Sequence, residues 1–326
     1  MWYNKIVETS LNFFLKSTKL SNFAKKIVDS GLKQAYLFES GDKEKNYAFC
    51  KMLSLLINCK NKNMCLTCDS CQKILNNNCI DFFVYPKNSA ILVDDIKEII
   101  DSCYVLPFEN DYKIYVLNNF DEANIASQNK FLKTLEEPPK NVIFLLNSTK
   151  SDMILPTIRS RCTKIVLPKF DREELISLLN QFGAEVSESA LENSNYELGN
   201  YISLLENNFE IEFDFCLNML KNMKNSSDIL KYSSQILKNN NFESVYKALF
   251  SILVDIKVFK INKDEIKNKN YAQDIQILSE DFSDKAVDEI LKNLICANKE
   301  LSFNTNLNLV VDCILIDILE EKHKWN

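Results

Sequence analysis

The first half of the chain alternates between short apolar runs and segments whose apolar residues recur at helical spacing. Runs that are apolar at nearly every position predict strands that are covered on both faces. The predicted strands are Ala35–Phe38, Phe82–Tyr85, Lys113–Leu117, Val142–Leu146 and Lys164–Leu167. The predicted helices are Ser21–Ser30, Tyr47–Ile57, a segment that begins at Asp94, and Ala123–Glu137. Strands that alternate with helices indicate an α/β fold with a parallel sheet covered on both sides.

Beyond Pro168 the apolar spacing is helical throughout. An amphipathic helix is predicted over Glu173–Phe182, with Gly183 at its end. Longer stretches of helical periodicity follow at Phe213–Met223, Val245–Val258 and Leu307–Leu319. The sequence therefore predicts three domains: an α/β domain over residues 1–168, a small helical domain over 169–206 and an all-α domain over 207–326.

Composition narrows the class of protein. The net charge is −6 and the pI about 5.2, so no overall positive field draws the chain to nucleic acid or to acidic membranes. No apolar run is long enough to span a bilayer, and the start of the chain lacks the layout of a secretory signal. We expect a cytoplasmic protein with reduced thiols, because eleven cysteines is an odd count that argues against a full disulfide framework.

Four of the cysteines lie within thirteen residues, at Cys59, Cys65, Cys68 and Cys71. Thiolates at this spacing can converge on one tetrahedral ion, and four of them leave no open position, so a structural zinc site is predicted. An iron–sulfur cluster is the rival, although Leu75 stands where its usual run has another cysteine. Free thiols on a lysine-rich loop are the remaining alternative.

A phosphate-binding loop belongs between the first predicted strand and the helix after it. Its remnants here are Ser40, Gly41 and Lys45. The segment holds one glycine, its acids Asp42 and Glu44 repel phosphate, and no Ser or Thr follows Lys45 to hold magnesium. We expect this vestigial loop to bind no ATP.

The usual position of a magnesium-binding acid, at the end of strand Lys113–Leu117, holds Asn118 and Asn119. An asparagine cannot supply the negative charge. Asp121 and Glu122 follow, and we interpret them as acids at the N-terminus of the next helix.

Two of the three arginines lie in one short turn, which ends with Ser160, Arg161 and Cys162. Arg161 has two interpretations. It is either a surface arginine near the end of a helix, worth little to stability, or an arginine offered to a phosphate bound elsewhere, since a planar, permanently charged guanidinium suits that task.

Taken together, these segments resemble the bacterial clamp-loader family of AAA+ proteins. The resemblance covers the first two hundred or so residues. Its anchors are Leu37–Glu39, the four-cysteine segment, Leu132–Pro139, Ile143–Thr149 and Leu155–Cys162.

The resemblance implies an AAA+-like domain with an inserted zinc module (59–71), a helical lid and a helical collar that joins a ring of subunits. It implies a non-catalytic stator without ATP, which presents Arg161 in trans to a neighbouring ATPase, with Ser160 and Cys162 supporting the turn. The implied partners are motor subunits of gamma or tau type and a delta subunit, and, through the complex, a sliding clamp and primed DNA.

Two alternatives stay open beside the stator. A motor subunit like gamma or tau would need Lys45 to bind phosphate through the degenerate loop. A redox or metal-sensing protein would be built on the cysteine cluster.

Overall fold

The computed structural model describes residues 14–87, 90–183, 186–238, 242–301 and 305–324. The chain forms two compact units. The α/β unit comprises Met1–Glu185 together with the short segment Glu197–Gly199, and the helical unit comprises Val186–Tyr196 and Asn200–Asn326. The predicted division into three domains remains a prediction.

A five-stranded parallel sheet forms the centre of the α/β unit, as the apolar runs predict. Its strands lie in the order β2-β3-β4-β1-β5. They are β1 (Ala35–Glu39), β2 (Phe82–Tyr85), β3 (Lys113–Leu117), β4 (Val142–Ser148) and β5 (Thr163–Val166). The carboxyl ends of β1, β3 and β4 therefore meet at one edge of the sheet, where ligands bind in open α/β folds.

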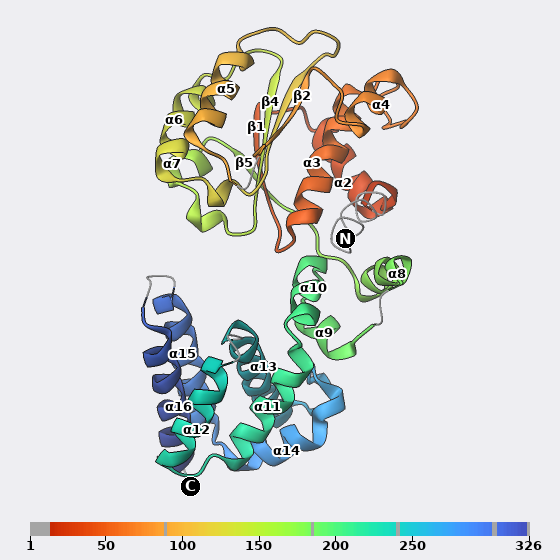
Figure 1. Ribbon diagram of the computed structural model, residues 1–326. Coiled ribbons are helices and arrows are strands. Elements are labelled where there is room, and N and C mark those ends of the chain that lie inside the picture. The colour runs from red at the N-terminus through yellow and green to blue at the C-terminus, as the bar shows by residue number, and fades with distance from the viewer. Residues whose placement is uncertain (1–13, 88–89, 184–185, 239–241, 302–304, 325–326) are drawn as a thin grey trace. The chain divides into compact units, whose positions relative to one another are not determined.

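Helices cover both faces of this sheet (Figure 1). One face carries α2 (Thr18–Asp29) and α3 (Lys43–Asn58), and the other carries α5 (Val93–Cys103) and α6 (Ile125–Glu136). Successive strand residues point to opposite faces. The rings of Phe38 on β1 and Phe49 on α3 lie 5.2 Å apart, whereas Leu37 packs in the cluster that contains residues of α5 and α6.

Within its described residues, the α/β unit contains three further α-helices. They are α4 (Asp69–Leu75), which the sequence did not predict, α7 (Pro156–Arg159) and α8 (Arg172–Phe182). Gly183 ends α8 in the left-handed conformation, with φ 65°, which confirms its predicted place.

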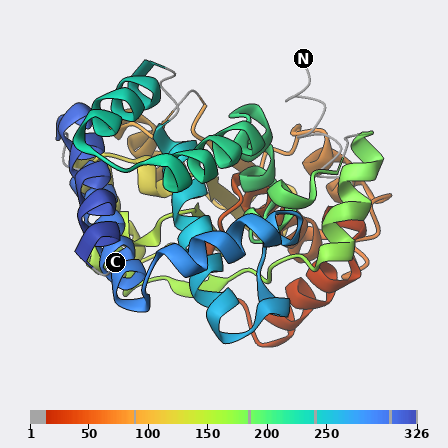
Figure 2. The same cartoon turned by 90° about the horizontal axis from the view of Figure 1, so that it is seen from below.

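The helical unit contains no strand among its described residues, as its periodicity predicts. Its helices are α9 (Glu188–Asn193), α10 (Leu198–Glu206, whose first two residues belong to the α/β unit), α11 (Phe209–Asn222), α12 (Ser226–Lys238), α13 (Phe242–Ile261), α14 (Ala272–Asp281), α15 (Asp284–Leu301) and α16 (Leu307–Lys324). Helix α13 packs on α11, and α15 lies side by side with α16 in both views (Figures 1 and 2). None of the described helices has the length and apolar character that crossing a membrane requires.

Candidate functional site

The vestigial loop lies at the carboxyl end of β1, where it leads into α3. Asp42, not a glycine-rich turn, starts the helix: its carboxylate accepts a hydrogen bond from the backbone N–H of Lys45 at 3.0 Å. The same carboxylate accepts from the N–H of Gly199 at 3.1 Å. A helix N-terminus attracts anions through its free N–H groups. Here a carboxylate of the chain itself takes up part of that capacity.

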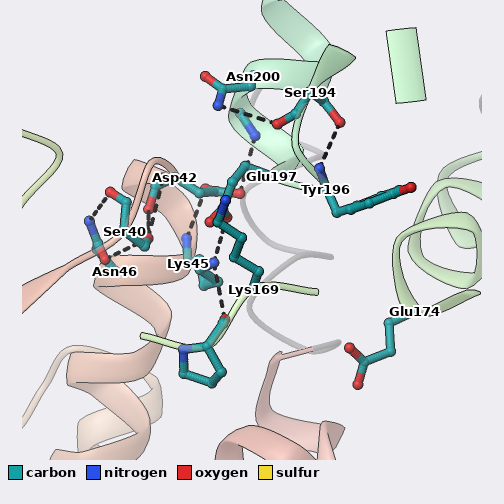
Figure 3. Close-up of polar contacts among 12 residues, drawn as sticks. Ser40, Asp42, Lys45, Asn46, Lys169, Glu174, Ser194, Tyr196, Glu197 and Asn200 are labelled. Carbon is teal, nitrogen blue, oxygen red and sulfur yellow. Dashed lines mark hydrogen bonds and ion pairs between the residues drawn. The ribbon is translucent and has the colours of Figure 1, made fainter. Parts of the chain in front are cut away.

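Lys45 is fully buried and points at a second carboxylate (Figure 3). Its Nζ lies 2.5 Å from Oε2 of Glu197, whose side chain is 5% exposed. Nζ also donates to the carbonyl oxygen of Pro168 at 3.3 Å and lies 5.0 Å from the ring centre of Phe170. The ammonium that would reach for a phosphate therefore has its partners within the α/β unit.

Burial raises the pKa of Glu197, because the charged carboxylate loses its water. Lys45 opposes this rise, and the carboxylate of Asp42 adds to it. Two carboxylates thus face the start of α3, where a phosphate loop would hold a triphosphate. An incoming phosphate would meet their negative charge and would have to displace a buried pair.

The loop is also held by neutral side chains. The hydroxyl of Ser40 lies 2.8 Å from Oδ1 of Asn46, and Nδ2 of Asn46 donates to the carbonyl oxygens of Ser40 and Ser148. Gly41 is exposed and its φ is not positive. The tight amide cradle that phosphate requires is not formed at this glycine.

Asparagine amides occupy the position of a magnesium-binding acid. The Nδ2 of Asn147 on β4 donates to Oδ1 of Asn118 at 2.6 Å, and the backbone N–H of Asn119 donates to Oδ1 of Asn147 at 2.9 Å. These bonds join the ends of β3 and β4 without any charge. The described site therefore offers amide oxygens but no carboxylate at this point.

Asp121 and Glu122 do lie at the start of a helical turn, but they do not belong to the helix predicted from Ala123. Both lie in a separate 3-10 turn, η1 (Phe120–Glu122), and α6 starts later, with Asn124 as its cap. Asp121 accepts from the backbone N–H of Lys150, and Glu122 pairs with Lys43 at 2.5 Å. Asn124 is a strong cap residue, so the helix needs no acid before it.

Arg161 follows α7 on the surface of the α/β unit. Its Nη1 donates to the carbonyl oxygen of Thr157 at 2.7 Å, and its Nη2 lies 2.5 Å from Oε1 of Glu136. Ser160 donates its hydroxyl to the same Thr157 oxygen at 3.0 Å. Cys162 is buried in the core beneath, and burial raises the pKa of its thiol to about 12. Cys162 thus packs the turn against the core, while Arg161 is exposed.

The four clustered cysteines converge. The sulfur atoms of Cys59, Cys65, Cys68 and Cys71 all lie within 4.8 Å of one another. Cys68 caps α4 and Cys71 lies in its first turn, so one short helix aims two of the sulfurs to the same side.

Backbone N–H groups support this cluster. The N–H of Cys65 donates to the sulfur of Cys59, and the N–H of Cys68 donates to the sulfur of Cys65, both at 3.4 Å. Hydrogen bonds from the side chain and backbone of Thr67 and from the N–H of Cys68 lower the pKa of Cys65 to about 5. Burial raises the pKa of Cys71, so the fit to a metal rests on the geometry: four sulfur atoms this close together match the tetrahedral shell of a zinc ion.

Several known proteins are similar to this chain in sequence. Residues 15–171 match the family model described as DNA polymerase III, delta subunit. The DNA polymerase III subunit gamma of Buchnera aphidicola subsp. Schizaphis graminum is 26% identical over 288 residues, which are 79% of this chain and 79% of that protein. The gamma/tau subunit of Mycoplasma pneumoniae is 31% identical over 163 residues, which are 49% of this chain and 24% of that protein.

Two solved structures are also similar. A DNA polymerase III gamma subunit-related protein from Thermotoga maritima has 19% identity and a TM-score of 0.37, covering 94% of this chain and all of that one. The DNA clamp loader delta protein of Bacillus subtilis has 11% identity and a TM-score of 0.31, covering 92% of this chain and 99% of that one.

Proposed function

We propose that this chain, whose residues 15–171 match the DNA polymerase III delta-subunit model, is a clamp-loader subunit of the delta, gamma and tau type and serves as the delta-prime subunit. In this role it is a stator. It binds no ATP, holds its place in the ring of subunits and assists a neighbour's ATPase while a sliding clamp is loaded for DNA replication.

The buried pair between Lys45 and Glu197 carries this proposal. A motor subunit needs its loop lysine free to contact the β- and γ-phosphates. Here that contact would separate Lys45 from Glu197. The Glu197 carboxylate would then be buried without its partner. Stranding one charge of a buried pair costs about 3–5 kcal/mol. Nucleotide binding would have to supply at least this much free energy before Lys45 could contact a phosphate.

Arg161 supplies the active part of the proposed role. It is exposed at the end of a turn whose base is fixed by Ser160 and Cys162. A guanidinium keeps its charge at any physiological pH and can donate two parallel hydrogen bonds to phosphate oxygens. We propose that it reaches the γ-phosphate of ATP held by an adjacent gamma or tau subunit.

The proposed partners are those motor subunits and a delta subunit, with the sliding clamp and primed DNA engaged through the whole complex. The cytoplasm is the proposed location. In this scheme the cysteine quartet holds a structural zinc ion, because four thiolates fill a tetrahedral shell and leave no position for a substrate.

A gamma- or tau-type motor is the second candidate function, since the similar proteins named above carry those names. The residues at the loop favour the stator over it. Lys45 is paired, Asn118 and Asn119 stand at the metal position, and Asp42 takes the helix N-terminus. If the chain were a motor, the isolated protein would bind Mg·ATP.

The test is the ATPase activity of a complex reconstituted from this chain and the motor and delta subunits of the same organism. Arg161→Ala should lower ATP turnover while the complex still assembles, since an arginine supplied in trans contributes about 10³-fold or more at the site it serves. The matched control is Arg172→Ala, the one arginine outside the turn. Normal turnover in the Arg161→Ala complex would contradict the proposed role.

A further inference from the structure

The guanidinium of Arg161 is held at two of its three nitrogens. Nη1 is fixed to the Thr157 carbonyl and Nη2 to the Glu136 carboxylate. An exposed arginine without partners samples many rotamers, and each must be given up when it binds. The contacts with Thr157 on α7 and Glu136 on α6 remove much of this rotamer freedom before any ligand binds.

Glu136 is placed by the way α6 ends. It is the last residue of the helix, Glu137 has already left helical geometry with φ −127°, and Pro138 and Pro139 cannot continue it. The C-terminal end of a helix carries partial negative charge, which adds to the carboxylate in attracting a cation. The end of α6 therefore fixes the position of the Glu136 carboxylate, and the fold brings Arg161 to it.

The contact leaves donors for a ligand. A guanidinium has five N–H bonds, and the two contacts occupy one on each terminal nitrogen. The N–H of Nε and one N–H on each terminal nitrogen stay available. Glu136 can therefore hold Arg161 while the remaining donors reach phosphate oxygens, and the carboxylate does not have to be displaced.

We infer that Glu136 is a positioning residue for Arg161, which sets the guanidinium in the geometry that it uses in trans. This inference rests on the proposed role of Arg161. The two side chains are 32% and 48% exposed, so the pair is solvated and contributes little to folding. Its effect should therefore appear in turnover and not in stability.

The chain provides a matched control one residue away. Glu137 is also exposed and carries the same charge, and within the described ranges no ion pair forms to its carboxylate. A general change in surface charge would affect both positions alike. A positioning role belongs to Glu136 alone.

The experiment compares steady-state ATP hydrolysis by complexes reconstituted with Glu136→Gln, Glu136→Asp or Glu137→Gln. We expect Glu136→Gln to lower kcat about two- to fivefold, the factor that an exposed pair supplies, with KM for ATP unchanged, since the motor binds the nucleotide. Glu136→Asp should recover part of the loss. Glu137→Gln should match the wild type.

A double variant separates this inference from the proposed function. In Arg161→Ala, the further change Glu136→Gln should have no effect, because the residue it positions is gone. If Arg161→Ala itself retains normal turnover, the trans role fails. If Arg161→Ala loses turnover but Glu136→Gln keeps or exceeds wild-type kcat, or if the losses simply add, the positioning role of Glu136 is wrong.

Discussion

Lys45, in the first turn of α3, pairs at 2.5 Å with Glu197, a residue 152 positions later in the sequence, and both side chains are buried. The carboxylate lies where a phosphate loop would direct its lysine toward a triphosphate. Under the proposed function, this contact gives Lys45 a carboxylate of the chain itself in place of a bound phosphate. The anion is already supplied by the chain.

Removing the cation should destabilise the fold. We expect Lys45→Met to lower the free energy of unfolding by about 3–5 kcal/mol, because the Glu197 carboxylate is left buried without its partner. Urea unfolding followed by circular dichroism measures this. Lys43→Met, two residues earlier, removes an exposed lysine that pairs with Glu122 and should cost no more than about 1 kcal/mol.

The double variant Lys45→Met/Glu197→Leu completes that comparison. With both charges replaced by apolar groups, most of the lost stability should return. Equal destabilisation by Lys43→Met and Lys45→Met, or no recovery in the double variant, would contradict the buried pair as the cause.

The destabilisation by Lys45→Met should depend on pH. Burial raises the pKa of Glu197 and Lys45 holds part of that rise back, so the folded-state pKa rises further when the lysine is lost. A carboxyl with a raised pKa binds its proton more tightly in the folded state. Its contribution to stability is present below the unfolded pKa and is lost as the pH rises through the folded pKa.

Unfolding of Lys45→Met should therefore become easier than that of Lys45→Met/Glu197→Leu as the pH is raised from 4.5, the ordinary pKa of a glutamate, toward 8. Urea midpoints of the two variants across this range give the result. A gap between them that stays constant or narrows with rising pH would show that Glu197 does not titrate as described.

The cysteine quartet should hold one zinc ion per chain. Metal analysis of protein purified without oxygen should find zinc and no iron. Removal of the metal with a chelator should lower the melting temperature, because the ion joins the segment that contains Cys59 and Cys65 to the start of α4. Cys68→Ser should lose the zinc, whereas Cys79→Ser, at a buried cysteine outside the quartet, should retain it. Iron absorbance would favour a cluster instead.

Cys162 should be inert toward alkylating reagents in the folded protein. It is 8% exposed, and burial raises the pKa of its thiol to about 12, so neither access nor thiolate is available. Cys296 and Cys313 are exposed and should react before Cys162. Mass spectrometry after brief treatment with iodoacetamide, with and without urea, distinguishes the sites; native labelling of Cys162 would mean that the turn at Arg161 opens.

The central strands β1, β3 and β4 could be predicted from the sequence because they are buried on both faces, whereas β5 lies at the edge of the sheet and is mostly exposed, contrary to the prediction that it is covered on both faces. Val142–Leu146 is apolar at every position, and the structure extends the same strand to Ser148. Helix α4 could not be predicted, since seven residues around Cys71 hold too little apolar periodicity. The helix predicted from Tyr47 begins earlier, at Lys43, because Asp42 caps it and charged residues conceal its first turn.

The candidate site was predictable only where local chemistry decides it. One glycine and two acids indicate a loop without phosphate affinity, and cysteine spacing indicates a metal site. The partners of Lys45 and Arg161 are different, because Glu197 and Glu136 approach them through the fold and no spacing in the sequence records that approach. Glu136 was part of a recognised motif, yet its contact with Arg161 appears only in three dimensions.

Binding of Mg·ATP to the isolated chain tests the central claim most directly. Titration calorimetry with the wild-type protein should give no saturable heat and no hydrolysis, because Glu197 and Asp42 already occupy the lysine and the helix N-terminus. Stoichiometric binding of Mg·ATP with turnover, abolished by Lys45→Met, would contradict the account and identify the chain as a motor.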